Sequence, residues 1–302
     1  MSLRAQSYFN LALCILLWAS IPVASKKILA ELNNLQLLFW STVFSVVALA
    51  ALVVGQRKVA ILRGYRLPSI LWLGWLGFLG AFLYYILLYG AFARTSASEG
   101  FILAYTWPIM VAVLALPLLG ERLTAARLLA VVTSFFGVVV IVTRGRLVEL
   151  SVTSLPGNLM ALCGAFVFAL FSVQGKRVVH DLTVAAFVYF VAALVCTAIA
   201  MAFVGFAPLP PAHIWGWVLY NGLLVNGISY LFWFKALQHG DTFVVSNLLY
   251  LTPALSLLFV RLFFEEPVHV SALFGLLFIV GGILLQSWQR ILGLASGKDT
   301  LN

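Results

Sequence analysis

Aromatic residues that carry polar atoms lie deep inside long apolar stretches of this sequence. Trp18 lies about ten residues into one stretch, and Tyr105 and Trp107 lie about eight to ten residues into another. At roughly 1.5 Å per residue, these positions are near the middle of a bilayer. Tyr84 and Tyr85 lie deeper than the interface in a third stretch. An unpaired phenol or indole N–H in hydrocarbon costs several kcal/mol, so we interpret the five as lining a central cavity, with interior packing as the alternative.

Amide side chains occur at similar depth in the second half of the sequence. Asn226 lies in the middle of one apolar stretch, and Asn247 with Tyr250 lies in the next. A buried Asn commonly forms a hydrogen bond between helices, worth around 1 kcal/mol. Both that role and contact with a substrate remain open for these residues.

Two prolines interrupt apolar stretches that are long enough to be helices. Pro108 and Pro253 each leave a backbone carbonyl unpaired one turn earlier and bend the helix. Such bends serve as hinges in transporters or as static kinks in other proteins. The matching placement of the two prolines favours hinges.

Ionisable groups are missing from the centres of the apolar stretches. No Asp, Glu or His lies there, whereas Glu121 and Glu266 follow two stretches and are expected to cap helices or pair with nearby Arg residues. Intramembrane enzymes need paired carboxylates, a Ser/His pair or metal ligands, and proton-driven carriers usually need a buried carboxylate or His. We therefore predict a protein that is not an enzyme, without a cofactor or metal site, whose transport is facilitative.

The composition identifies the solvent of this chain as lipid. Of 302 residues, 64% are hydrophobic and 9% are charged, against roughly 25% charged in soluble domains. The net charge of +9 comes from Lys and Arg scattered at the ends of apolar stretches, which suits lipid headgroups better than nucleic acid. The expected partners are membrane lipid and a small molecule, with no nucleic acid, and a monomer is expected.

Ten stretches are long enough to cross a membrane. Their approximate bounds are 8–28, 35–54, 69–92, 98–119, 124–142, 158–175, 182–204, 214–237, 242–263 and 268–289. We interpret the first as a retained helix and not as a signal peptide. With the N-terminus inside, twelve of the 18 Lys and Arg residues fall on inner segments, which predicts cytoplasmic termini in a cell (inner) membrane.

The sequence repeats itself after 145 residues. Trp72 matches Trp217, Tyr85 matches Tyr230, and further pairs include Tyr105 with Tyr250, Pro108 with Pro253, and Glu121 with Glu266. The halves are 1–150 and 151–302, each with five spans. Because five is odd, the second half must enter the membrane from the opposite side. The expected fold is therefore an all-α integral membrane protein of two inverted five-helix repeats around a central cavity.

The whole chain resembles the drug/metabolite transporter superfamily, and its EamA-type branch most closely. The resemblance rests on two five-span halves, a Pro within the fourth and ninth spans, and Gly120-Glu121-Arg122-Leu123. Tyr84-Tyr85 and Tyr105-Thr106-Trp107-Pro108 look like the aromatic amino acid exporters of the YddG type. That resemblance implies a cavity lined by aromatic residues on the third and fourth spans. At the corresponding place on the sixth span, this sequence has only Phe166, Phe168 and Phe171.

These observations predict a secondary transporter that exports small amphipathic metabolites, aromatic amino acids foremost, by alternating access. Exporters of other amino acids, nucleosides or drugs are alternatives within the same superfamily. From other classes, a non-gated channel and an intramembrane enzyme are disfavoured, since neither a filter motif nor a catalytic set lies at membrane depth.

Overall fold

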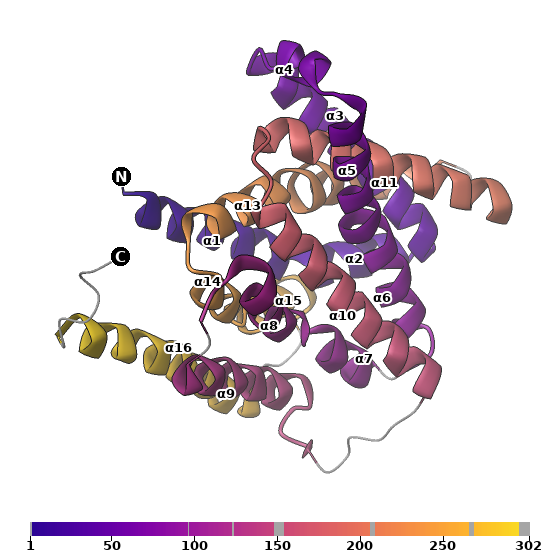
Figure 1. Cartoon of the computed structure of the whole chain (residues 1–302). Coiled ribbons are helices and arrows are strands. Elements are labelled where there is room, and N and C mark those ends of the chain that lie inside the picture. Colours follow the sequence, from indigo (N-terminus) through magenta and orange to yellow (C-terminus); the bar gives the residue numbers. More distant parts are fainter. Residues whose placement is uncertain are drawn as a thin grey trace.

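Helices make up the regular structure of this protein throughout the described residues (Figure 1). The computed structural model describes residues 2–95, 97–122, 124–147, 154–205, 209–265 and 269–295, without the side chains of 92, 97–99 and 287–295. The expected boundary between the halves at 150, and Glu266, lie outside these ranges. Within the ranges there is no β-strand, which agrees with the predicted all-α class.

The helices follow the apolar stretches of the sequence. In chain order they are α1 (Leu3–Ala19), α2 (Ile21–Leu29), α3 (Asn34–Gly55), α4 (Val59–Gly64), α5 (Leu67–Gly77), η1 (Phe78–Leu83), α6 (Tyr84–Phe92), α7 (Ala97–Ala104), α8 (Trp107–Leu119), α9 (Ala125–Val142), α10 (Leu155–Lys176), α11 (Leu182–Val204), η3 (Ala212–Ile214), α12 (Trp215–Tyr220), η4 (Asn221–Ile228), α13 (Ser229–His239), α14 (Thr242–Leu248), α15 (Leu251–Phe264) and α16 (Ser271–Ala295).

Eight helical segments of the described chain have the length and apolar composition to cross a membrane. They are Leu3–Leu29, Asn34–Gly55, Leu67–Ala91, Gly100–Leu119, Ala125–Val142, Leu155–Lys176, Leu182–Val204 and Thr242–Phe264. The two other expected spans, 214–237 and 268–289, are also helical, as α12–η4–α13 and α16. The described apolar part of α16, Ser271–Gln286, is shorter than the eight.

Polar residues in the loops decide where several helices begin. The Asn33 side chain accepts from the Gln36 backbone N–H, and the Gln36 side chain accepts from the Asn33 backbone N–H, both at 2.9 Å. The Asp181 carboxylate caps α11 by accepting from the backbone N–H groups of Thr183 and Val184. Such caps satisfy backbone donors that the first turn leaves unpaired, so the chain leaves each loop in a defined direction.

The two prolines that were expected to bend helices each stand in the first turn of a new helix. Pro108 follows an interruption between α7 and α8, and Pro253 follows one between α14 and α15. Because proline has no N–H and its ring clashes with the preceding turn, it fits best at a helix start. The interruptions at 105–106 and 249–250 are 144 residues apart, one residue short of the 145-residue repeat.

Two π-helical segments, η1 and η4, were not expected from the sequence. The backbone carbonyl of Gly80 in η1 accepts a hydrogen bond from the Tyr230 hydroxyl at 3.3 Å, and that of Gly222 in η4 accepts from Ser45 Oγ at 2.8 Å. Widened turns lack the usual i→i−4 bond. Hydroxyl groups from other helices therefore supply partners for carbonyls of both segments.

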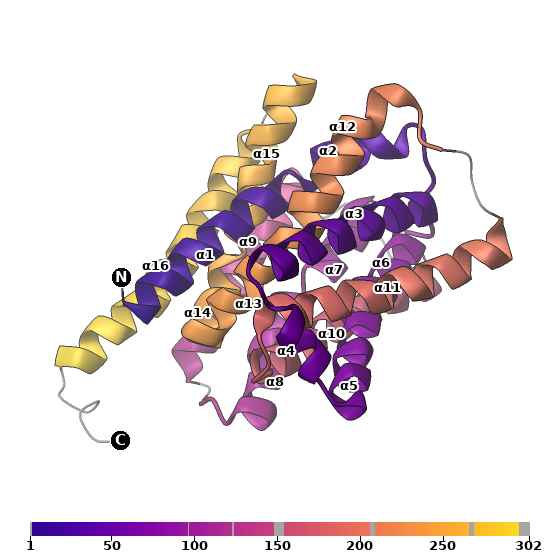
Figure 2. The ribbon, with the colours of Figure 1, turned by 90° about the horizontal axis from the view of Figure 1, so that it is seen from above.

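Helices that are distant in sequence pack against one another across the two halves. α9 and α16 run side by side at one edge of the molecule (Figure 1), where Gly137 and Gly275 let the two backbones approach closely. α3 packs along α11 (Figure 2), α1 along α13, and α10 along α6 and α8. The largest hydrophobic cluster therefore contains residues from both halves.

Candidate functional site

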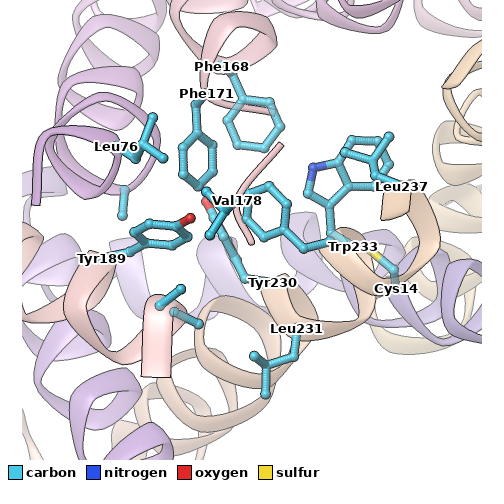
Figure 3. Packing of buried hydrophobic residues seen from close by; sticks show 14 of the residues in the cluster. Cys14, Leu76, Phe168, Phe171, Val178, Tyr189, Tyr230, Leu231, Trp233 and Leu237 are labelled. Atoms are coloured by element: carbon cyan, nitrogen blue, oxygen red, sulfur yellow. The ribbon is translucent and has the colours of Figure 1, made fainter. Parts of the chain in front are cut away.

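Trp18 lies at the centre of a group of aromatic rings. Its ring centroid is 6.1 Å from those of Trp107 and Phe168, 6.2 Å from that of Tyr230, and 5.7 Å from that of Trp233. Figure 3 shows Phe168 on α10 and Tyr230 and Trp233 on α13 among the surrounding buried residues. We call these five residues, with Tyr84, the aromatic cluster. It joins α1, α6 and α8 of the first half to α10 and α13 of the second.

The indole N–H groups of Trp18 and Trp233 each have a hydrogen-bond partner. Trp18 Nε1 donates to Ser229 Oγ at 2.8 Å, and Trp233 Nε1 donates to Ser172 Oγ at 3.2 Å. An indole has only this one donor. The two bonds therefore fix the ring orientations and leave the apolar faces to make contact with other groups.

Tyr84 and Tyr85 occupy one side of the aromatic cluster. The ring centroids of Tyr84 and Phe168 are 4.6 Å apart, and the Tyr85 hydroxyl donates to Asn226 Oδ1 at 3.3 Å. Tyr84, Tyr85 and Trp18 keep some accessible surface, whereas Tyr230 is buried. Three other predicted site residues of the first half, Tyr84, Tyr85 and Trp107, are thus brought together with Trp18, and Asn226 of the second half joins them.

Tyr105 belongs to a different group from Trp107, although only one residue separates them. The Tyr105 ring stacks on Phe101 with centroids 4.4 Å apart, and it shares a hydrophobic cluster with Tyr250 and Ile279. The chain turns at 105–106 between α7 and α8. Side chains on the two sides of that turn therefore point in different directions, which their spacing in the sequence did not reveal.

Asn247 forms a helix-to-helix hydrogen bond. Its Nδ2 donates to Oε1 of Gln286 on α16 at 2.9 Å, and both side chains are buried. Asn247 and Tyr250 therefore face α9 and α16, while Val245 and Leu249 of the same segment pack into the largest hydrophobic cluster. The structure places the eight predicted substrate-binding residues in two neighbouring groups instead of one.

The sequence prediction missed several residues of these groups. Phe168, Tyr230 and Trp233 complete the aromatic cluster, and Gln286 pairs with Asn247. Two signals were present: Tyr230 matches Tyr85 in the 145-residue register, and Phe168 lies at the sixth-span place that the family resemblance indicated. No comparable signal marked Trp233 or Gln286.

A network of charged groups connects the halves at one end of the molecule. Lys176 Nζ lies 3.0 Å from Glu121 Oε1, and it also donates to Gly240 O at 3.1 Å and Thr242 Oγ1 at 2.6 Å. The Thr242 hydroxyl in turn contacts the Glu121 carboxylate. Glu121 thus pairs with a lysine of the second half, and the prediction that it pairs with an arginine is wrong. The direction of α10 explains this, since its last residue, Lys176, ends beside Glu121.

Two further ion pairs lie at the same end, which we call the ion-pair end. Lys58 Nζ is 2.8 Å from Asp181 Oδ2, and Arg127 Nη2 is 2.7 Å from Asp241 Oδ2. Burial alone would raise the pKa of Asp181, but its bonds to Lys58 and to backbone N–H groups of α11 hold it below the usual value. Each pair joins a residue of the first half to one of the second.

The charged side chains described at the opposite end include an exposed ion pair and two lysines beside an aromatic ring. His213 Nε2 lies 3.3 Å from Glu31 Oε1, on an exposed surface. Lys26 and Lys27 lie over the Phe264 ring, with Nζ 4.2 and 5.1 Å from its centroid. Within the described ranges, no three His, Cys, Asp or Glu side chains gather as a metal site requires.

The apolar helices and the aromatic cluster between them are features of a multi-pass membrane transporter. The EamA-like transporter family matches this chain twice, over residues 6–143 and 155–288, and the chain belongs to this family. The resemblance inferred from the sequence is therefore confirmed. Since its family and its named relatives are transporters, the protein is a membrane transporter and not an enzyme.

Two relatives are similar over most of their length. The chain is 28% identical over 294 residues to an uncharacterized transporter of Archaeoglobus fulgidus, covering 95% of this chain and 100% of that protein. It is 29% identical over 274 residues to the aromatic amino acid exporter YddG of Ancylobacter novellus, covering 89% and 92%. A protein crystal structure shares the fold, with a TM-score of 0.83, 21% identity, and coverage of 93% of this chain and 97% of that one.

Proposed function

We propose that this protein exports aromatic amino acids across the cell (inner) membrane by alternating access. The single observation that carries the proposal is the position of Trp18, in contact with four aromatic rings from both halves of the chain. Aromatic faces attract other aromatic rings through edge-to-face and offset contacts. The relationship to an aromatic amino acid exporter supports the same class of cargo.

The proposed architecture is ten spans in two inverted halves, 1–150 and 151–302. The family match occurs once in each half. Close backbone contacts also recur in the repeat register: an added Cβ at Gly77 would collide with Tyr189, and one at Gly222 with Phe44. Both the two glycines and their two partners are 145 residues apart.

The same correspondence occurs between α9 and α16. An added Cβ at Gly137 would collide with the carbonyl oxygen of Gly275, and one at Gly282 with that of Ala130. Again, Gly137 and Gly282, and Ala130 and Gly275, are 145 residues apart. Five spans in each half would invert the second half and place the termini on the same, cytoplasmic side.

Alternating access would use the interruptions before Pro108 and Pro253 as hinges. At both places one helix ends and another begins, so a change of backbone angle there breaks few hydrogen bonds. The ion-pair end would be the cytoplasmic side, because it carries the basic loop that contains Lys58, Arg63 and Arg66. The three ion pairs between the halves would then hold that side closed.

Facilitative transport is the proposed mode. The acidic residues of the ion-pair end, Glu121, Asp181 and Asp241, stand at helix termini and already have cationic partners. A proton-coupled carrier needs a carboxylate or histidine that gains and loses a proton within the transport path. The aromatic cluster contains neither.

Counterflow in proteoliposomes tests the proposed function. Vesicles loaded with unlabelled L-phenylalanine should accumulate labelled L-phenylalanine, L-tyrosine or L-tryptophan with saturable kinetics and without a pH gradient. Accumulation of nucleosides or cationic drugs alone would assign another cargo, and conductance without saturation would indicate a channel. Strict dependence on a pH gradient would contradict the facilitative mode.

Labelling of single cysteines near the two termini tests the architecture. Both should react only from the cytoplasmic side of the membrane. Termini on opposite sides would contradict two inverted halves of five spans. They would require an odd total number of crossings, so the two halves could not contain the same number.

A further inference from the structure

Five buried polar side chains near the second helix interruption have atoms without a hydrogen-bond partner. Thr252 Oγ1 is one of them, in the first turn of α15. The other four atoms are Ser246 Oγ, Asn247 Oδ1, Tyr250 Oη and Gln286 Nε2. Ser246, Asn247 and Tyr250 are fully buried, and Gln286 is 9% exposed. We call these four residues the polar cluster.

Helical spacing and one hydrogen bond hold the polar cluster together. Ser246 and Tyr250 are four residues apart and Asn247 and Tyr250 three, so these side chains share one side of the segment. Asn247 Nδ2 donates to Gln286 Oε1 at 2.9 Å, which brings α16 to the same side. Asn247 and Tyr250 therefore both face the side of α9 and α16, and Ser246 precedes them in the same segment.

Unpartnered polar atoms are unusual in a protein interior. Most buried polar groups in folded proteins have at least one partner, and each exception needs an explanation. Within the hydrocarbon region the penalty is larger than in a soluble protein, because no bulk water reaches such groups. Four exceptions in one cluster are best explained by a polar ligand that completes their hydrogen bonds.

The kinds of atoms in the polar cluster indicate what that ligand is. The hydroxyls of Ser246 and Tyr250 and the Gln286 amide nitrogen can all donate, and Asn247 Oδ1 can only accept. α15 begins immediately after Tyr250, and no side chain caps its first turn. The positive end of a helix favours negative charge. Several neutral donors beside a helix start suit a carboxylate, and the single acceptor suits an ammonium group.

The polar cluster also lies close to the aromatic cluster. The backbone N–H of Ile109 in α8 approaches the Tyr250 hydroxyl without completing a hydrogen bond to it. Ile109 is two residues after Trp107, which belongs to the aromatic cluster. The start of α8 thus connects the two groups of side chains.

We propose that the polar cluster binds the carboxylate and ammonium groups of an α-amino acid, with Ser246, Tyr250 and Gln286 as donors. This inference rests on the proposed transport of amino acids, and it separates recognition of the zwitterion from recognition of the side chain. The aromatic cluster then selects the side chain. The polar cluster favours compounds that carry a carboxylate over amines that lack one.

The substitution Tyr250→Phe tests the role of the unpartnered hydroxyl. Proteoliposomes should be assayed with labelled L-phenylalanine and L-leucine, and with phenylethylamine as a competitor that has no carboxylate. The loss of one hydrogen bond to a charged group should raise KM for a transported amino acid about tenfold or more, with inhibition by phenylethylamine unchanged. The melting temperature of the ligand-free protein should stay the same or rise, because an unpaired buried hydroxyl is removed.

Tyr189→Phe is the matched control. The Tyr189 hydroxyl is also buried and unpartnered, but it packs near Phe171 and Phe234, away from α16. This variant should keep the KM values of the unmodified protein. Ser246→Ala provides a second test. It should also raise KM for the transported amino acid and leave inhibition by phenylethylamine unchanged.

The outcomes separate this inference from the proposed function. Transport of leucine but not phenylalanine, with the predicted Tyr250→Phe effect, would refute aromatic export and support the carboxylate site. Three results for Tyr250→Phe would overturn the carboxylate site alone. The variant could transport phenylalanine with an unchanged KM, it could lose affinity for the amino acids and for phenylethylamine equally, or it could melt at a lower temperature than the unmodified protein. An unmodified protein that recognises none of the three compounds, or only phenylethylamine, would overturn both.

Discussion

The ammonium group of Lys176, at the end of α10, lies 3.0 Å from the carboxylate of Glu121, just beyond the end of α8. It also donates to the Gly240 carbonyl and the Thr242 hydroxyl. An ammonium group has three donors, so all of them are used. One lysine thus connects three segments that must separate if the protein opens at this end.

Lys176→Met should favour opening at the proposed cytoplasmic side. The substitution leaves the partly buried Glu121 without its cation, which is destabilising for the closed arrangement. The buried Cys14, beside Trp233 in Figure 3, is a natural reporter. In a Cys163→Ala, Cys196→Ala background, a maleimide added from the cytoplasmic side should label Cys14 roughly fivefold faster in the variant.

The control for this experiment lies at the opposite end. His213 faces Glu31 there on an exposed surface, where ion pairs contribute little. His213→Gln should therefore leave the labelling rate of Cys14 unchanged. Equal rates in Lys176→Met and the unmodified protein would argue that the ion pair does not keep this side closed.

Tyr85→Phe should destabilise the protein more than Tyr84→Phe. The Tyr85 hydroxyl donates to Asn226 Oδ1, and its removal leaves a buried amide oxygen without that partner, at a cost of about 1–3 kcal/mol. Tyr84→Phe keeps the ring contact with Phe168 and should change stability by less than about 0.5 kcal/mol. Thermal unfolding of both variants in detergent measures the difference. Equal melting temperatures would show that the Tyr85–Asn226 bond contributes nothing to stability.

Gly282→Ala should weaken the packing of α16 on α9, whereas Gly281→Ala should not. An added Cβ at Gly282 would collide with the Ala130 carbonyl and the Ser134 side chain, but one at Gly281 meets no atom within 4 Å. Overpacking of this kind typically costs about 1–3 kcal/mol. Thermal unfolding should therefore distinguish two neighbouring glycines, and an equal loss in both variants would contradict the observed face of α16.

The Lys58–Asp181 pair should make a pH-dependent contribution to stability. The pKa of Asp181 is lowered from its ordinary value of 3.8, because the bonds to Lys58 and backbone N–H groups outweigh the effect of burial. A group whose pKa falls on folding stabilises the protein above its unfolded pKa and loses that effect as pH falls through the folded value. The contribution should thus be complete above about pH 4 and disappear in stronger acid.

Asp181→Asn provides the measurement for this prediction. At neutral pH the variant should unfold at a lower temperature than the unmodified protein, since the carboxylate pairs with Lys58 and caps α11. Below about pH 4 the difference should shrink. A difference that grows with acidity would contradict the direction of the pKa change.

Much of the helix arrangement could be predicted from apolar length alone. The span expected at 182–204 agrees with α11, Leu182–Val204, and the one at 35–54 agrees with α3, Asn34–Gly55. A run of this length has no other stable form in lipid than a helix. The interruption at Ser20, between α1 and α2, and the π-helical segments were not predicted, since both depend on contacts with other helices.

The amino-acid sequence determined the solvent and the class of the protein, because these follow from composition and from the length of apolar runs. Only the tertiary structure decided which side chains meet. It separated Tyr105 from Trp107, paired Glu121 with Lys176, and joined Tyr85 to Asn226. The two pairs connect the halves, and the separation arises at a turn between two helices. Such contacts depend on the direction and rotation of packed helices, which no local pattern of residues specifies.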